Sequence, residues 1–296
     1  MSVEQFEAQR GRLIAIAYGI LGSVMEAEDV VQEAWLRWAS TDWERVDEPA
    51  AFLTTVVTRL AIDRLRSAAR RRESYVGPWL PEPIVTDVES DPADRVAEAE
   101  RISMALLTAM ERLNPVERAV FLLREVFDYD YAEIAPIVGR SVGNCRQIGA
   151  RARSRVGDPA RARPLEGESD RAVVDGFLRA LAAGDVDELV ARLAADVVLW
   201  SDGGGKRRAA RHPVHGADRV ATFLLNVTRR GAREGGTARP VRANGGLALR
   251  LEMPDGIYGV MTFEFEEGVI TAIRSVINPD KLGHVPGSVT DGSGSS

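Results

Sequence analysis

Residues 141–155 combine side chains that can read the edges of DNA bases with side chains that can bind phosphate. If this segment is helical, one face carries the polar or small residues Gly143, Arg146, Gln147, Ala150 and Ser154, with Asn144 and Arg151 at its flanks. Arginine pairs with guanine, and asparagine or glutamine pairs with adenine, through two hydrogen bonds in the major groove. The later arginines Arg151, Arg153 and Arg155 suit phosphates, which position a protein on DNA without specifying a sequence.

The element that must present these side chains is predicted as the second helix of a helix-turn-helix. The first helix is expected over residues 130–138, the turn at Gly139-Arg140, and Ser141 at the N-cap of the second helix. The face that would pack on the first helix is apolar at three- and four-residue spacing: Val142, Cys145, Ile148, Gly149 and Ala152. A plain turn between surface helices is the alternative, but the cap, the turn and the division into faces favour DNA binding.

Charge is distributed unevenly along the chain. The net charge is −6, yet two arginine-rich islands lie at residues 63–73 and 146–163. Local charge governs contact with phosphates, so the islands outweigh the acidic total. The charge pattern is therefore compatible with a nucleic-acid partner.

Composition limits the class of protein. The 296 residues predict two or three domains, and the single cysteine, Cys145, rules out an internal disulfide framework and fits a reducing cytosol. No apolar run approaches the roughly 20 residues that span a bilayer. The N-terminus lacks the basic-then-apolar order of a secretory signal. We expect a cytoplasmic protein with no membrane partner.

The hydrophobic pattern divides the chain into helical parts and one mixed part. Residues 4–73 are helical throughout, and in the second helical part Asn114, Pro115 and Glu117 predict a helix start. After Asp170, helices are followed by segments with period-two alternation, an order that favours an α+β fold. The expected boundaries are 1–74 and 99–158 for two all-α domains, 75–98 and 159–168 for linkers, 169–283 for an α+β domain and 284–296 for a disordered tail.

The α+β part contains polar groups that suit catalysis or metal binding. These are Trp200, Asp202, Lys206, His212, His215 and Asp280. Asp202 or a histidine could act as a general base in a pocket. The two histidines lack a neighbouring carboxylate or cysteine, and the Gly203–Lys206 run lacks the full P-loop spacing. We predict no catalytic residue, no metal and no cofactor.

The first linker is unusual because residues 75–84 read YVGPWLPEPI. Its three prolines remove backbone donors and favour extended conformations in the residues before them. The bulky pair Trp79-Leu80 stands where a simple tether would carry Gly, Ser or charge. We expect this pair to pack against a folded part of the chain.

Three segments together resemble a known family. They are AYGILGSVMEAEDVVQEAWLRW at 17–38, EPAAFLTTVVTRLAIDRLRSAARRRE at 48–73 and LLTAMERLNPVERAVFLLREVFDYDYAEIAPIVGRSVGNCRQIGARARSRV at 106–156. The first two resemble region 2, and the third resembles region 4, of the extracytoplasmic-function (ECF) RNA polymerase sigma factors. The resemblance implies a non-catalytic subunit that directs core RNA polymerase to promoters, with region 2 at the −10 element and region 4 at the −35 element.

The resemblance also implies which residues bind each partner. The polymerase contacts, on the clamp helices of the β′ subunit, are assigned to Asp29, Gln32, Glu33 and Arg37, and the β subunit is a further expected partner. The −10 contacts are assigned to Asp63, Arg64, Arg66 and Arg70. The −35 contacts are assigned to Ser141, Gly143, Asn144, Arg146, Gln147, Arg151 and Arg153. Many family members have Asn near Thr58 or Arg59, so its absence here makes a detailed −10 preference uncertain.

The C-terminal third resembles the SnoaL-like, ketosteroid-isomerase-like fold, in which a curved sheet and helices enclose an apolar pocket for a small-molecule ligand. The motifs WLPEP (79–83), DGGGK (202–206) and NPDKL (278–282) match the SigJ-type sigma factors with such an extension. This subgroup implies regulation of the sigma regions from within the chain. The residues expected to mediate it are Trp79, Leu80, Pro81, Glu82, Pro83, Asp202, Lys206, Asn278, Pro279, Asp280, Lys281 and Leu282.

Alternatives remain open for the linker, the C-terminal domain and the whole chain. In the leading hypothesis, Trp79-Leu80 contacts the NPDKL segment and pins the linker, whereas in the alternative Trp79 packs on its own helical domain. The C-terminal domain could instead be an active enzyme for a small hydrophobic metabolite. A one-component transcription factor would lack a region-2-like module, and the EDVVQEAWLRW segment argues against it.

Overall fold

The computed structural model describes residues 3–41, 46–72, 74–86, 99, 102–157 and 168–285. These residues form two compact units: unit 1 comprises Met1–Ser74 and Asp91–Arg163, and unit 2 comprises Tyr75–Ser90 and Pro164–Ser296. The first part of the expected linker 75–98 therefore belongs to the C-terminal unit. Residues 87–98, most of the linker 159–168 and residues 286–296 of the expected tail lie outside the described residues.

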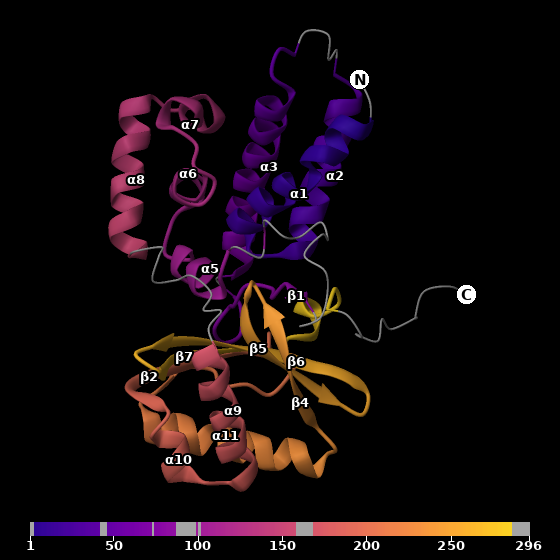
Figure 1. Ribbon diagram of the computed structural model, residues 1–296. Helices are drawn as coiled ribbons and strands as arrows, with labels where there is room; N and C mark the ends of the chain where they lie inside the picture. The colour runs from indigo at the N-terminus through magenta and orange to yellow at the C-terminus, as the bar shows by residue number, and fades with distance from the viewer. Residues whose placement is uncertain are drawn as a thin grey trace, which may run out of the picture. The chain divides into compact units, whose positions relative to one another are not determined.

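The described residues of unit 1 form helices and no strand, as predicted (Figure 1). Its helices are α1 (Val3–Leu21), α2 (Val24–Ala39), α3 (Pro49–Arg72), α5 (Met104–Met110), α6 (Pro115–Glu125), α7 (Tyr131–Val138) and α8 (Val142–Val156). Local signals define several of their ends. The side chain of Ser23 caps α2, and α6 begins with the predicted capping box between Asn114 and Glu117, followed by Pro115 at the first helical position.

The two helical sets of unit 1 pack directly on each other. Helix α1 contacts α2, α3 and α6, while α3 contacts both α6 and α7. Gly19 allows a close approach, because a Cβ at this position would lie 2.6 Å from Cδ2 of Leu122. Tyr18 and Phe121 are fully buried in the same core. The residues expected to form two separate domains thus share one core in this structure.

A buried arginine crosses this core. Arg118 of α6 is 1% exposed, and its guanidinium donates to the carbonyl oxygens of Ile20 (3.0 Å) and Met110 (2.8 Å). It also forms an ion pair with Glu111 at 2.6 Å. A buried charge needs such partners to offset its lost hydration. Arg118 therefore joins the end of α1 to the end of α5.

Unit 2 is an α+β domain with a seven-stranded sheet, which confirms the predicted fold class. The strand order is β1-β4-β5-β6-β7-β2-β3, and β2 runs parallel to β7 whereas every other neighbouring pair is antiparallel. The elements are β1 (Val85–Thr86), α9 (Glu168–Ala183), α10 (Val186–Val190), β2 (Leu193–Asp202), β3 (Val214–His215), α11 (Ala217–Arg233), β4 (Thr237–Ala243), β5 (Gly246–Met253), β6 (Gly256–Glu266), β7 (Val269–Val276) and the short 3₁₀ helix η3 (Pro279–Lys281).

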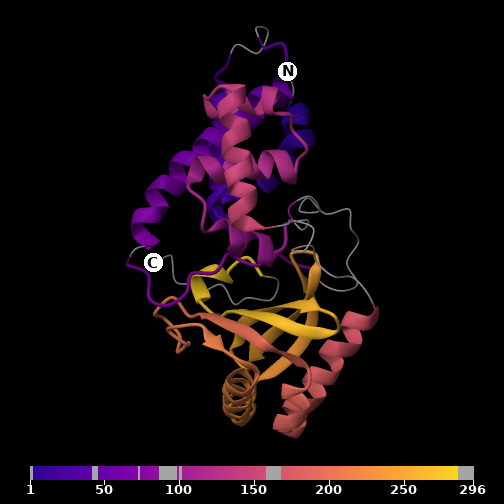
Figure 2. The same cartoon turned by 90° about the vertical axis from the view of Figure 1, so that its left-hand side faces the viewer.

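The helices of unit 2 cover one face of its sheet, as both views show (Figures 1 and 2). Phe177 of α9, Leu224 of α11 and Leu199 of β2 belong to the buried apolar core between them. Side chains alternate along a strand, so Asp202 projects from the opposite face to Leu199. The linker contacts Asp202 through Leu80, and its strand β1 joins the edge of the sheet, where Val85 pairs with Ala243 of β4.

Replacement of Arg118 by Met is expected to destabilise unit 1 by about 3 kcal/mol, because it leaves the Ile20 and Met110 carbonyls and the Glu111 carboxylate without their buried partner. Urea unfolding measures the change in the free energy of unfolding, and hydrogen–deuterium exchange of unit 1 peptides assigns this change to unit 1. The control is Arg112→Met, since Arg112 is exposed in the same region. Equal stability of the two variants would contradict a structural role for the buried guanidinium.

Candidate functional site

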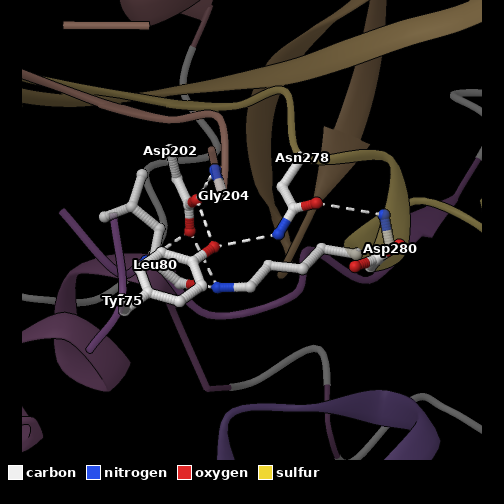
Figure 3. Close-up of polar contacts among 7 residues, drawn as sticks. Tyr75, Leu80, Asp202, Gly204, Asn278 and Asp280 are labelled. Atoms are coloured by element: carbon white, nitrogen blue, oxygen red, sulfur yellow. Dashed lines mark hydrogen bonds and ion pairs between the residues drawn. The ribbon is translucent and has the colours of Figure 1, made fainter. Parts of the chain in front are cut away.

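The candidate regulatory site is centred on a carboxylate that is fully buried at the end of β2. Asp202 is 0% exposed and accepts hydrogen bonds from the hydroxyl of Tyr75 (2.5 Å), the backbone N–H of Leu80 (2.8 Å) and the backbone N–H of Gly204 (3.1 Å). The Nζ of Lys281 forms an ion pair with it at 2.7 Å. Figure 3 shows Tyr75, Leu80 and Gly204 around the Asp202 carboxylate. Four donors compensate the charge for its lost hydration.

Lys281, at the end of η3, is the cation of this site and is 6% exposed. Its ammonium also donates to the backbone carbonyl of Leu80. The same nitrogen lies 4.0 Å from the ring centroid of Trp79 and 5.0 Å from that of Tyr75. Both aromatic faces attract the ammonium through cation–π interactions. Lys281 thus contacts three residues of the linker as well as Asp202.

Asn278 holds η3 and the linker together. Its side-chain oxygen accepts from the backbone N–H of Asp280 at 3.1 Å, and its side-chain amide donates to the Tyr75 hydroxyl at 2.9 Å (Figure 3). We call Tyr75, Trp79, Leu80, Asp202, Asn278 and Lys281 the linker lock. Its members come from three segments that are distant in the sequence: the linker, the end of β2 and the segment around η3.

Tyr75 stays protonated in the linker lock. Burial, and then the hydrogen bond to the Asp202 carboxylate, raise the pKa of the phenol above its ordinary value. Loss of the phenolic proton would bring a second negative charge next to Asp202. The hydroxyl therefore remains a hydrogen-bond donor at neutral pH.

The rest of the linker is also bound within unit 2. The Ile84 N–H donates to the side chain of Asn244 at 3.1 Å, and the Asn244 N–H donates to the Ile84 carbonyl at 2.9 Å. The Nε2 of His284 lies 2.9 Å from the carbonyl oxygen of Pro83, and its Nδ1 lies 3.9 Å from the Glu82 carboxylate. His284, which the sequence analysis placed in a disordered tail, is thus half-buried against the linker.

Some of the predicted regulatory residues are exposed and others are buried. Lys206 and Asp280 form an ion pair at 2.6 Å, but their side chains are 55% and 60% exposed. Exposed pairs of this kind contribute little to stability. Leu80, Glu82 and Lys281 are all buried. The buried lock, and not the exposed pair, therefore contributes most to binding of the linker.

Sequence reasoning missed four contributors to this site: Tyr75, Gly204, Asn244 and His284. Tyr75 opens the linker, and the sequence predicts no role for it. A hydroxyl beside a proline-rich apolar segment was the available signal, since a buried tyrosine usually needs a partner for its hydroxyl. No local pattern indicates Asn244 or His284, because their partners lie far away in the sequence.

The helix-turn-helix has the predicted division of faces. Gly139 ends α7 in the left-handed conformation, and the side chain of Ser141 accepts from the N–H of Asn144 at 3.2 Å. On the docked face Val142 is half-buried and the other four residues are buried, whereas the opposite side is exposed at Gly143, Asn144, Arg146, Gln147 and Arg151. Burial raises the pKa of the Cys145 thiol, so this cysteine is poorly suited to redox chemistry.

Two arginines of α8 are already paired. Arg153 forms an ion pair with Glu125, and Arg155 pairs with Glu117 at 2.8 Å, the same carboxylate that completes the capping box of α6. These arginines secure α8 on α6 in this structure. A phosphate contact through Arg153 therefore requires it to exchange its carboxylate partner for DNA.

The residues assigned to polymerase and to −10 DNA lie on α2 and α3, and several are paired with each other. Arg64 forms an ion pair with Asp29 at 2.5 Å, which joins the two assigned surfaces. The other pairs are Arg66–Asp63 at 2.8 Å and Arg37–Glu33 at 2.7 Å. Gln32 is exposed, and the side chain of Arg70 lies outside the described parts of the chain.

Helix α3 is hydrogen-bonded to the first helix of the helix-turn-helix. The Arg59 guanidinium donates to the carbonyl oxygens of Ile137 (2.9 Å) and Pro136 (2.8 Å). The hydroxyls of Thr54 and Tyr129 are 3.2 Å apart. The segments assigned to the −10 and −35 elements are therefore in direct contact within unit 1.

Neither a metal site nor a membrane span emerges from the described residues. They contain no group of three or more His, Cys, Asp or Glu side chains able to hold a metal ion. None of the helices described is both long and apolar enough to cross a membrane. Asp202, the alternative general base, is enclosed by its four donors and is not accessible to a substrate proton.

Comparison with known proteins identifies relatives for both units. The family model for Sigma-70 region 2 matches residues 5–71, and that for Sigma-70, region 4 matches residues 103–156. The chain is 40% identical over 294 residues to the ECF RNA polymerase sigma factor SigJ of Mycobacterium tuberculosis, covering 95% of this chain and 93% of the relative. It is 33% identical over 280 residues to the probable ECF RNA polymerase sigma factor SigI of that organism, covering 94% and 93%.

The similarity extends to the solved structures. The crystal structure of the Mycobacterium tuberculosis ECF sigma factor SigJ has a TM-score of 0.79 and 35% sequence identity to this chain. The alignment covers 96% of this chain and 99% of that structure. The likeness therefore includes the α+β unit as well as the two helical sets.

Tyr75→Phe is expected to loosen the linker lock, because it removes one of the four donors to the buried Asp202 carboxylate. A hydrogen bond to a charged group contributes about 1.5–3 kcal/mol, so amide exchange at Leu80 and Ile84 should accelerate roughly 10- to 150-fold. Hydrogen–deuterium exchange measured by NMR reports both amides. Tyr258→Phe is the matched control, since Tyr258 is also in unit 2 and its ring contacts Arg207, outside the linker lock.

The rate of amide exchange at Leu80 is also expected to depend on pH. Because the pKa of Tyr75 in the folded protein lies above its ordinary value of about 10, the lock keeps its full stability below pH ~10 and loses it as the pH rises further. Faster Leu80 exchange above pH 10, beyond the intrinsic rate increase, is expected in the wild type and not in Tyr75→Phe. Identical pH profiles for the two proteins would contradict the role of the phenol.

Proposed function

The chain belongs to the ECF RNA polymerase sigma factors, and on that premise we propose that unit 2 regulates the sigma regions from within the same chain. Sigma factors of this family direct transcription initiation, bind core RNA polymerase and promoter DNA, and are not enzymes. The proposed device is the linker lock. It acts on the segment that separates region 2 from region 4 in the sequence.

The observation that carries this proposal is the set of contacts made by Asp202. Two of its donors, Tyr75 and the Leu80 N–H, come from the linker, and Lys281 binds both Asp202 and the Leu80 carbonyl. Any rearrangement of region 2 relative to region 4 changes the path of the linker between them. The state of the lock is therefore coupled to the arrangement of the two sigma regions.

The lock is strong enough to affect this equilibrium and weak enough to open. Removing one partner of a buried ion pair costs about 3–5 kcal/mol, because the other charge is left buried and unpaired. Opening the intact lock lets both charges regain water, and therefore costs less. A coupling of about 1–3 kcal/mol changes the population of a competent state roughly 5- to 150-fold.

The packing within unit 1 supports the existence of a second, open arrangement. The −10 and −35 elements are separated by about 25 base pairs, or ~85 Å of B-DNA at 3.4 Å per base pair. Helix α3 has 24 residues, which corresponds to a length of about 36 Å. With Arg59 of α3 hydrogen-bonded to α7, the segments assigned to the two elements lie in contact, whereas the elements themselves are far apart on the DNA. We infer that promoter engagement requires these contacts to break.

We infer that the linker lock restrains this opening. The docked linker has a fixed path on unit 2, whereas a released linker regains the conformational freedom that allows the two regions to separate. The prolines reduce the entropy lost on docking, because they already restrict the free chain. The small-molecule ligand predicted for the α+β domain would act on this equilibrium only if it bound the locked and released states differently.

Lys281→Ala is expected to raise transcription from a promoter recognised by this sigma factor by at least about fivefold, since it removes the cation of the lock. The readout is in vitro transcription with core polymerase. Lys206→Ala is the matched control, because Lys206 also pairs with an aspartate but the pair is exposed. Trp79→Ala tests the same restraint from the linker side, and should act in the same direction.

Unchanged output from both Lys281→Ala and Trp79→Ala, with unit 2 still folded by circular dichroism, would contradict the coupling. Lower output from both would show that the lock supports the active arrangement, and would overturn the restraining role. Amide exchange at Leu80 verifies in each variant that the lock has opened.

We also propose that the exposed face of α8 reads the −35 element. Arg146 and Gln147 lie in the N-terminal half of the helix, are exposed, and follow the Ser141 cap. In a helix-turn-helix this half enters the major groove. Arg151 is further along the helix and suits a phosphate contact.

Arg146→Ala and Gln147→Ala are each expected to cost about 1–3 kcal/mol of discrimination at one −35 base pair, whereas Arg151→Ala should weaken all sequences equally. Transcription from a panel of single-base −35 variants measures discrimination. A pull-down with core polymerase confirms that binding to the enzyme is intact. An equal loss on every promoter for Arg146→Ala and Gln147→Ala would favour phosphate contacts and contradict base readout.

A further inference from the structure

The connection between β2 and β3 of unit 2 carries a concentration of cationic residues. From Gly203 to Ala217 the sequence GGGKRRAARHPVHGA has no acidic residue, in a chain whose net charge is −6. We call residues 206–215 the basic loop. Its cationic or titratable members are Lys206, Arg207, Arg208, Arg211, His212 and His215.

The backbone of the basic loop is held in place by unit 2. The carbonyl oxygen of Gly203 accepts from the N–H groups of Lys206 (2.9 Å) and Arg207 (3.1 Å). The Arg207 guanidinium donates to the carbonyl oxygen of Tyr258 and stacks on its ring, 4.6 Å from the centroid. Val214 and His215 pair with β2. Arg207 is thus structural, and the remaining cations lie on a fixed support.

Four of these side chains are exposed and make no polar contact within the described part of the chain. Within the described part of the chain, Arg208, Arg211, His212 and His215 have no side-chain hydrogen bond or ion pair. Some exposed arginines of the protein, such as Arg37 and Arg66, instead pair with a nearby carboxylate. The basic loop therefore presents charge that no acidic residue of the described chain neutralises.

The basic loop also contacts the linker. A Cβ at Gly77 would lie 3.9 Å from both the carbonyl oxygen of Ala210 and the Cα of Arg211, and a Cβ at Gly205 would lie 3.3 Å from Val76. The basic loop and the start of the linker therefore lie against each other within unit 2.

We propose that the basic loop binds the sugar–phosphate backbone of duplex DNA, through Arg208 and Arg211, as a contact of unit 2 with no sequence preference. The planar guanidinium matches phosphate oxygens, and exposed cations gain affinity by releasing counterions from DNA. The loop has no large apolar side chain of the kind that anchors protein–protein interfaces. The family's promoter DNA is the polyanion this chain is known to meet. The inference does not depend on the regulatory role of the lock.

The test measures binding of the full chain to a fluorescent promoter-free duplex at several NaCl concentrations. Replacing both Arg208 and Arg211 by Ala should weaken binding and reduce the slope of log Kd against log [NaCl] by about 1.8, at ~0.9 per phosphate contact. Duplexes of different sequence should lose affinity equally. Arg208→Lys with Arg211→Lys, which keeps the charge, should retain most of the slope.

The control variant carries Arg171→Ala and Arg179→Ala on α9, which remove the same charge from exposed positions of unit 2. Its slope should equal that of the wild type. An equal reduction of the slope in the two alanine variants would show that the effect depends only on net charge, and would overturn the proposal. A wild-type slope in the basic-loop variant would also overturn it, as would tight binding of a poly-glutamate peptide to the loop without binding of the duplex.

Discussion

A carboxylate without water must be surrounded by donors, and the arrangement of unit 2 around Asp202 follows from this requirement. The chain supplies a phenol, two backbone N–H groups and an ammonium to a side chain that is 0% exposed. Two of the donors belong to the linker, and the ammonium belongs to the segment after the last strand. One buried charge therefore determines where an otherwise extended, proline-rich segment is bound.

Unit 1 uses a buried charge in a similar way but with the opposite sign. Arg118 replaces its lost hydration with the carbonyls of Ile20 and Met110 and with the Glu111 carboxylate. In both units the buried group joins segments that are far apart in the sequence. Such groups favour one specific arrangement, because alternative packings leave the charge unsatisfied.

The charged surfaces of the sigma regions are largely paired within the chain. The Arg64–Asp29 pair joins a residue assigned to −10 DNA with one assigned to polymerase. The Arg153–Glu125 pair joins α8 with the neighbouring helix α6. Binding of DNA or polymerase to these residues replaces one ionic contact by another, and exposed pairs cost little to exchange. Arg208 and Arg211 of the basic loop have no such partner in the described residues, and the same holds for Arg146 and Arg151 of α8.

The sequence alone determined the features that depend on local order. Periodicity and capping residues predicted the helices and the two faces of α8, as at Asn114 and Ser141, because these signals act over three or four residues. The resemblance of the motifs to ECF sigma factors can also be recognised from the sequence, and the relatives confirm it. The tertiary structure decided which charges are buried and what they bind. It brings Tyr75 to Asp202 and Lys281 to Leu80, assigns the linker to unit 2, adds β1 to the sheet edge, and pairs Arg155 with Glu117. These contacts join residues far apart in the chain, so the partners depend on how the whole chain packs and not on any local pattern.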